Sequence, residues 1–170
     1  SITPLQTLAF YNAIANDGVM LKPRFLREVK DFDKSVEVFN KEIINPSICS
    51  KETAKKVQKM MQNVVEKKHG TAHNIYSPSF SMAGKTGTCQ TEYWKESGLY
   101  ISSFAGYFPV ENPKYSCIVV IHKPDKEIGY YGNIVAAPVF KKIAQKIYSE
   151  TAIEDRLKGI EITELESENK

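Results

Sequence analysis

The sequence lacks long apolar segments and is poor in cysteine. No run of about 18 apolar residues occurs, so no transmembrane helix is predicted. The N-terminus shows no basic start followed by an apolar run and small residues, so no signal peptide is predicted. The three cysteines, Cys49, Cys89 and Cys117, have no C-x-x-C spacing, so neither a zinc knuckle nor a disulfide framework is implied. No metal or other cofactor is expected.

An excess of charge of one sign is also missing. The chain carries 23 basic and 20 acidic side chains, a net charge of +3, which gives no indication of a nucleic-acid partner. With 42% hydrophobic and 25% charged residues, the 170-residue chain has the composition of one soluble globular domain. A chain of this length can bury a core without disulfides or metals.

The first part of the chain combines a helical and an extended pattern. Thr3 is a capping residue, and Pro4 suits the first position of a helix because its missing N–H costs nothing there. Gly18 ends this predicted helix, since glycine tolerates the left-handed conformation that follows a helix. Residues 19–48 are predicted to be extended, with a hairpin that turns at residues 31–34.

The second part predicts an antiparallel sheet between two helices. Ser50 caps a helix that Gly70 is expected to end. Alternating β-rich runs and a turn between them then indicate a three-stranded meander. The predicted strands and the last helix cover residues 80–91, 100–108, 115–122 and 136–149.

The order of these elements defines a fold class. It predicts an α+β protein, an antiparallel sheet with helices packed on it. Residues 1–149 would form the folded portion. Composition changes after Tyr148, where acidic residues dominate, so residues 150–170 are predicted to be a polar, flexible tail.

The segment Ala83–Thr88, with the sequence A-G-K-T-G-T, carries the chemistry. Lys85 offers a positive charge, and the hydroxyls of Thr86 and Thr88 can donate to a carboxylate. Gly87 leaves room for a peptide laid along the strand. The alternative is an ordinary strand edge with a solvated lysine and two β-branched residues.

A phosphate-binding loop is a second functional hypothesis for the same segment. Gly84-Lys85-Thr86 matches the end of a P-loop, but the glycine required five residues earlier is Ser79. A P-loop also leads into a helix, whereas residues 88–91 continue as a predicted strand. The phosphate-binding hypothesis therefore fails on both counts.

The segment Ala83–Thr88 resembles the third motif, K-[ST]-G, of penicillin-binding proteins and serine β-lactamases. Its surroundings are similar to class B penicillin-binding proteins, the transpeptidases of cell division and elongation. The resemblance covers residues 1 to about 148 and implies a partial penicillin-binding protein/serine β-lactamase-like transpeptidase fold. The similar segments are I-T-P-L-Q at 2–6, A-N-D-G-V at 15–19, G-T-A at 70–72, S-F-A-G-Y-F-P at 103–109, Y-Y-G at 130–132 and A-A-P-V-F at 136–140.

The resemblance also implies roles for single residues. In this family a serine attacks a D-Ala-D-Ala stem peptide, and the acyl group passes to an amine of a neighbouring strand; β-lactams acylate the same serine. Lys85 would help to bind substrate and hold the proton network around the serine of the family's second motif. The backbone N–H of Thr88 would form half of the oxyanion hole, and the hydroxyls of Thr86 and Thr88 would bind the terminal carboxylate. Gly87 would let the substrate pair along the strand.

The family's S-x-x-K and S-x-N motifs should precede K-T-G. Here the S-x-x-K match is Ser167–Lys170, which lies in the polar tail together with the S-x-N match at 167–169. A Y-x-N variant at 131–133 also follows the motif. No nucleophile is therefore assigned to this chain. It is expected to be the C-terminal part of a transpeptidase domain, without the serine, and to be inactive alone.

Other reactive or metal-binding side chains predict no further site. His69, His73 and His122 lack ligand spacing, so solvated or capping roles are expected. Cys89 directly follows the motif and is expected to be a small buried strand residue rather than a reactive thiol.

Aromatic and basic side chains leave alternatives open. The aromatic residues near the motif would either line a substrate groove or anchor loops and pack in the core. The lysines of the second helix would face solvent or contact anionic wall polymer. These residues are Tyr93, Trp94, Tyr100 and Tyr107, and Lys51, Lys55, Lys56, Lys59, Lys67 and Lys68.

Two functional hypotheses follow. The first is a piece of a class B transpeptidase on the extracytoplasmic (periplasmic) face of the inner membrane, anchored by an N-terminal segment outside this chain. Its partners would be stem peptides, β-lactams and cell-wall synthesis proteins. The second is a non-catalytic binding or scaffold module with the same fold. Because an uncovered apolar face usually finds a partner, a homodimer or strand-exchanged assembly is expected.

Overall fold

A three-stranded antiparallel sheet organises the molecule. The computed structural model describes residues 2–91 and 98–151. The strands β5 (Ala83–Thr91), β6 (Leu99–Phe108) and β7 (Tyr115–His122) lie in the order β5-β6-β7, which confirms the predicted meander. The predicted first strand began three residues too early: Ser81 lies before β5, and its hydroxyl accepts a hydrogen bond from the Val110 N–H instead of joining the ladder.

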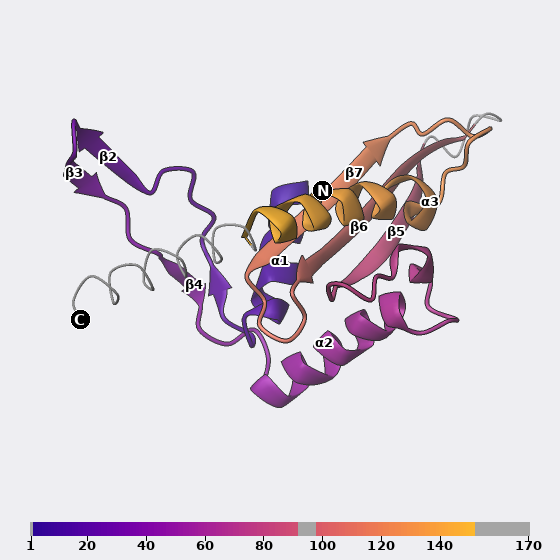
Figure 1. Ribbon diagram of the computed structural model, residues 1–170, viewed down its shortest axis with the longest axis horizontal. Helices are drawn as coiled ribbons and strands as arrows, with labels where there is room; N and C mark the ends of the chain where they lie inside the picture. Colours follow the sequence, from indigo (N-terminus) through magenta and orange to yellow (C-terminus); the bar gives the residue numbers. More distant parts are fainter. Residues whose placement is uncertain (1, 92–97, 152–170) are drawn as a thin grey trace, which may run out of the picture.

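Helices cover both faces of this sheet (Figure 1). The helices α1 (Pro4–Ala15) and α2 (Lys51–Glu66) enclose one hydrophobic cluster with Tyr107. The short helix α3 (Gly132–Val135) and the helix over residues 137–151 enclose another with Phe104. The alternation of side chains along β6 sends Phe104 and Tyr107 to opposite faces, so both faces are buried. The predicted α+β class is confirmed.

The N-terminal ends of α1 and α2 are as expected, but the end of α2 is not. The side chains of Thr3 and Ser50 cap their helices by accepting backbone N–H bonds. The prediction that Gly70 ends the second helix is wrong, since α2 ends at Glu66. Gly70 lies in the following turn, where a Cβ would come within 2.3 Å of the Val64 carbonyl oxygen, so the glycine serves close packing there.

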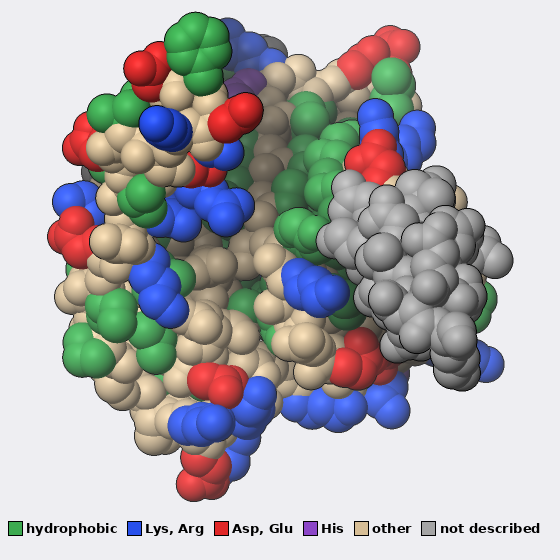
Figure 2. All heavy atoms as spheres, turned by 60° about the vertical axis from the view of Figure 1, so that its left-hand side comes forward, with side chains coloured by type: hydrophobic (Ala, Val, Ile, Leu, Met, Phe, Trp, Pro, Cys, Tyr) green, Lys and Arg blue, Asp and Glu red, His purple; other side chains and the backbone are tan. Residues whose placement is uncertain are grey.

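An arm of short strands projects from the sheet (Figure 1). Its base pairs β1 (Met20–Leu21) with β4 (Ile43–Asn45), and its hairpin pairs β2 (Glu28–Asp31) with β3 (Lys34–Val38). The predicted hairpin and its turn are confirmed. Phe32 in the turn is 95% exposed. Figure 2 shows hydrophobic side chains dispersed among charged ones on this side of the molecule.

The C-terminal helix lies where it is predicted, since the predicted range is 136–149 and the helix covers residues 137–151. The short helix α3, which starts at Gly132, was not predicted, and a break at Ala136 separates the two helices. Pro138 lacks the N–H that would bond to residue 134, which accounts for the interruption. The predicted tail lies outside the described residues from residue 152 on. Within the described ranges, no helix is both long and apolar enough to cross a membrane.

Candidate active site

The motif residues lie on β5, which is an edge strand. Within the described part of the chain, β5 pairs with β6 alone, so its other edge offers unpaired backbone groups. Side chains alternate along a strand. Lys85 therefore faces the side of α1 and α2, while Thr86 and Thr88 face the side of α3. Lys85 and Thr88 are exposed, and Thr86 is partly exposed.

Lys85 lies between the edge of β5 and an apolar groove. Its ammonium group donates a hydrogen bond to the carbonyl oxygen of Thr86, at 2.7 Å. On the other side it borders a cavity of about 570 Å³ between α1 and α2. Phe10 and Met60 line this groove and remain largely exposed. An amine at the mouth of an apolar groove is close to bulk solvent on one side and to hydrocarbon on the other.

Thr86 has a neighbour that sequence reasoning missed as a site residue. The hydroxyl oxygens of Thr71 and Thr86 lie 3.4 Å apart. Thr71 follows α2 in the turn that Gly70 allows, and it is exposed. In the sequence, the G-T-A segment at 70–72 stands out only through the family resemblance, and no spacing rule relates Thr71 to Thr86, 15 residues later.

Thr88 is held from the opposite side by the entry to α3. The backbone N–H of Gly132 donates to the Thr88 hydroxyl oxygen, at 3.1 Å. A Cβ on Gly132 would lie 2.4 Å from the Ser103 carbonyl oxygen and 2.7 Å from that of Gly87. Only glycine can approach the two strands this closely, so residue 132 is tied directly to the motif. Sequence reasoning did not identify this contact.

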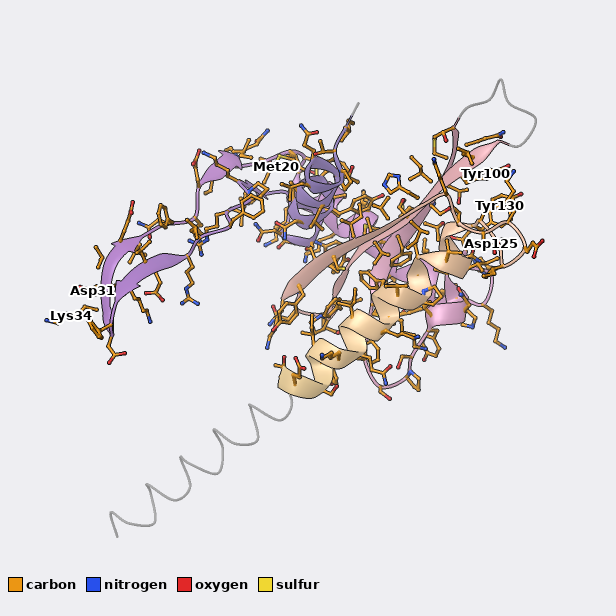
Figure 3. All side chains as sticks on the ribbon, turned by 90° about the horizontal axis from the view of Figure 1, so that it is seen from above. Met20, Asp31, Lys34, Tyr100, Asp125 and Tyr130 are labelled. Atoms are coloured by element: carbon orange, nitrogen blue, oxygen red, sulfur yellow. The ribbon has the colours of Figure 1, made fainter. Side chains whose placement is uncertain are left out.

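Tyrosines gather where the segment before α3 meets β6. The rings of Tyr100 and Tyr130 stack with their centres 4.1 Å apart, and the Lys126 ammonium lies 5.4 Å from the centre of the Tyr100 ring. Figure 3 shows Tyr100 and Tyr130 beside each other, at the far end of the molecule from the arm tip at Asp31. Among the predicted groove aromatics, Tyr100 thus anchors the segment that carries Gly132.

Other residues singled out in the sequence occupy different environments. Cys89 is exposed, so the prediction that it is buried is wrong; it lies near the end of β5, an edge strand within the described part of the chain. Tyr107 is fully buried, which assigns it to the core rather than to a groove. Desolvation raises the pKa of Tyr107 to about 12. Tyr93 and Trp94 lie outside the described residues.

The histidines and the helix lysines have structural surroundings. One ring nitrogen of His73 lies 3.1 Å from the Val65 carbonyl oxygen near the end of α2, a capping position of the kind expected. Throughout the described ranges, no cluster of three or more His, Cys, Asp or Glu side chains could hold a metal ion. The lysines of α2 and its end face solvent, and Lys51 and Lys55 form ion pairs with Asp17.

The arrangement brings several hydrogen-bond donors to one strand edge. An ammonium group, two hydroxyl groups and the unpaired backbone edge of β5 lie within four consecutive residues, 85–88. Such a set can bind an extended peptide by strand addition and its carboxylate by charge-assisted hydrogen bonds.

A second cavity, of about 640 Å³, lies away from the motif. It is lined by Phe80, Pro109 and Tyr148 among others, and none of the donors of residues 85–88 lines it.

Comparison with known proteins places the chain in a family. The model of the penicillin binding protein transpeptidase domain matches residues 1–145. The chain is 33% identical over 147 residues to the peptidoglycan D,D-transpeptidase FtsI of Buchnera aphidicola subsp. Baizongia pistaciae, covering 85% of this chain and 24% of that protein. It is 32% identical over 157 residues to PbpB of Mycobacterium tuberculosis, covering 85% and 22%. The chain thus spans about a quarter of the length of these relatives.

Solved structures agree with this assignment. The crystal structure of penicillin-binding protein 3 from Mycobacterium tuberculosis matches with a TM-score of 0.74 and 30% identity, over 89% of this chain and 36% of that one. The corresponding values for the TP domain of penicillin-binding protein 3 from Burkholderia pseudomallei are 0.66 and 25%, over 88% and 43%. The chain belongs to the penicillin-binding protein transpeptidase-domain family. Its relatives are of class B, so the predicted family and its fold are confirmed.

Proposed function

We propose that this chain supplies the substrate-binding strand of a serine-type peptidoglycan D,D-transpeptidase. The observation that carries the proposal is the exposure of Lys85 and Thr88, with Thr86 between them, along the open edge of β5. The family membership of residues 1–145 supports the same function. The whole protein would act at the extracytoplasmic face of the inner membrane, held there by an anchor outside these residues.

The reaction has two steps. A serine hydroxyl attacks the carbonyl between the two D-alanines of a stem peptide, its proton passes to the leaving amine, and D-alanine departs. The resulting ester is then attacked by an amine of a neighbouring stem peptide, which forms the cross-link and returns the serine. Each step passes through an oxyanion, and one positioned donor there is worth about 3–4 kcal/mol.

The residues of β5 would divide the work between them. The backbone N–H of Thr88 would donate to the oxyanion, and the hydroxyls of Thr86 and Thr88 would bind the substrate's terminal carboxylate. A hydrogen bond to a charged group contributes about 1.5–3 kcal/mol. The ammonium of Lys85 would bind substrate and assist proton transfer around the serines. Gly87 would let the stem peptide pair with the open edge of β5.

The nucleophile in this proposal lies outside the 170 residues. The chain's S-x-x-K, Ser167–Lys170, follows the motif strand and lies outside the described residues. The apolar groove between α1 and α2 supports the proposal, because exposed apolar surface beside Lys85 is suited to cover by a further segment of the domain. A non-catalytic module with this fold is the alternative, favoured by the same lack of an upstream serine motif in these residues.

A fluorescent penicillin tests the proposal. We expect the protein that joins these residues to the rest of a transpeptidase domain to be labelled, and this chain alone to stay unlabelled. Lys85→Ala should slow labelling by about 100-fold or more, as expected for loss of a group that takes part in proton transfer. Lys114→Ala is the matched control, because Lys114 is also exposed but lies in the turn between β6 and β7.

Two outcomes would overturn the proposal. An unlabelled complete protein would favour the scaffold alternative. A serine-linked penicilloyl adduct on the isolated chain, found by mass spectrometry, would show that the nucleophile had been placed wrongly.

A further inference from the structure

Ser102 is a fully buried polar residue in the middle of β6. Its exposed fraction is 0%, and its register partner on β5 is Thr88. Partners in register point to the same face of the sheet, so Ser102 and Thr88 both face α3. The Ser102 hydroxyl donates a hydrogen bond to the carbonyl oxygen of Tyr130. A buried hydroxyl costs free energy unless it is hydrogen-bonded, and the Tyr130 carbonyl is the partner that Ser102 has here.

The Tyr130 carbonyl that Ser102 binds lies two residues before Gly132, whose N–H holds the Thr88 hydroxyl. Tyr130 is followed by Tyr131, the N-cap residue of α3, and then by Gly132, whose N–H donates to the Thr88 hydroxyl. The Tyr130 ring also stacks on Tyr100 of β6. The segment 130–132 is therefore fixed to β6 by a hydrogen bond and a ring contact, and it is fixed to β5 through Thr88.

This arrangement determines what the Thr88 hydroxyl can do. A hydroxyl has one hydrogen to donate, and its oxygen accepts. Since the Gly132 N–H already donates to that oxygen, at 3.1 Å, the hydroxyl hydrogen is directed elsewhere. A hydroxyl that accepts a hydrogen bond also becomes a better donor. Thr88 is thus prepared to donate to a carboxylate at the edge of β5.

We propose that Ser102 is a positioning residue for carboxylate recognition. By holding the Tyr130 carbonyl, it keeps the Gly132 N–H on the Thr88 hydroxyl and so orients that hydroxyl toward the substrate's carboxylate. The inference rests on the proposed function, because it assigns Thr88 the carboxylate-binding role. Ser102 itself touches neither the substrate nor the reacting atoms.

The test compares acylation by benzylpenicillin with acylation by its methyl ester, in the complete protein. The ester lacks the anionic carboxylate, so the ratio of the two second-order rate constants measures carboxylate recognition alone. Thr88→Val should lower this acid-to-ester ratio by about tenfold or more, as for loss of a hydrogen bond to a charged group. Ser102→Ala should lower it by about three- to tenfold and leave the rate with the ester within about twofold of wild type.

Ser116→Ala is the matched control. Ser116 is a partly buried serine of the same sheet, on β7, and its side chain accepts a hydrogen bond from Asn12. Its loss should leave the acid-to-ester ratio unchanged. Hydrogen exchange of a peptide spanning residues 128–134 should become faster in Ser102→Ala but not in Ser116→Ala. If Ser102→Ala does not fold, Ser102→Cys fills the site with a somewhat larger side chain and a weaker donor, and the same change in the ratio is expected in reduced size.

The outcomes separate the inference from the proposed function. If Thr88→Val lowers the ratio and the Ser102 variants do not, the inference is wrong and the proposed function stands. If the Ser102 variants slow acid and ester equally, Ser102 is structural and the inference is again wrong. If Thr88→Val itself leaves the ratio unchanged, the proposed carboxylate-binding role of Thr88 is wrong, and the inference about Ser102 is wrong with it.

Discussion

At the scale of the residue, Tyr107 carries a polar group without a partner in the described structure. Its side chain belongs to the cluster with Ile14, Met61 and Ala83, its hydroxyl is buried, and no hydrogen-bond partner for that hydroxyl occurs in the described ranges. An unsatisfied buried hydroxyl costs about 1–3 kcal/mol. We therefore expect Tyr107→Phe to raise the free energy of unfolding by about 1 kcal/mol, measured by urea denaturation at pH 7.

The pH dependence of the free energy of unfolding, compared between the wild type and Tyr107→Phe, provides a control. Burial raises the pKa of Tyr107 from 10.0 to about 12, so the folded state keeps the proton that the unfolded state releases. The stability contribution of this group is complete below pH 10 and is lost as the pH rises toward 12. The advantage of Tyr107→Phe should therefore widen above pH 10. An advantage that stays constant would show that the phenol is not buried as described.

At the scale of the element, Asp17 joins the end of α1 to the start of α2. Its carboxylate lies 2.7 Å from the Lys55 ammonium and 3.3 Å from that of Lys51. The hydrogen bond from Lys55 is the main cause that lowers the pKa of Asp17. A lowered folded-state pKa gives stability that is present above the ordinary value of 3.8 and lost as the pH falls further.

Asp17→Asn tests this link without disturbing the turn. Asparagine also tolerates the positive φ of 53° at this position, so the variant removes the charge and little else. We expect it to lower the free energy of unfolding at pH 7 by about 0.5–1 kcal/mol, the range of exposed ion pairs, with the difference vanishing near pH 2. Asp33→Asn, in the exposed hairpin turn, is the control and should leave the free energy of unfolding at pH 7 unchanged.

The β2–β3 hairpin is the element with the least support from the core. All of its residues except Glu28 are exposed, and isolated two-stranded hairpins are marginally stable in water. We expect the backbone amides of β2 and β3 to exchange with deuterium at least about 100-fold faster than those of β6. Equal protection of the two regions would show that the arm is held by contacts that the structure does not contain.

The starts of the helices could be predicted from the sequence, but the end of α2 could not. The starts of α1 and α2 could be predicted because Thr3 and Ser50 act on N–H groups within the same turn. The end of α2 was misplaced because Gly70 suggested a helix stop, whereas the chain had already turned at Lys67. Helix caps and the alternation of strand side chains can be predicted from neighbouring residues. A glycine is ambiguous, because it is used for close packing as readily as for ending a helix.

At the scale of the whole molecule, exposed apolar surface is the feature from which we expect the isolated chain to associate. The groove beside Lys85 leaves the large apolar side chains of Phe10 and Met60 largely in solvent. Contiguous apolar surface favours association. We therefore expect the isolated chain to form dimers or larger assemblies at high concentration, measured by multi-angle light scattering. Met60→Lys, which puts a charge at the groove, should reduce the association, and a wild-type monomer at every concentration would contradict it.

The motif strand, the meander and the family could be predicted from the amino-acid sequence, because alternation, turns and short motifs are local patterns. The groups that meet the motif could be identified only from the packing of the elements. Gly132 reaches Thr88 across 44 residues, and Thr71 reaches Thr86 across 15. These contacts arise because α3 and α2 pack against the sheet, and packing distance bears no fixed relation to sequence distance. For the same reason, the buried state of Tyr107 and the exposed state of Cys89 could be read only from the layers around their strands.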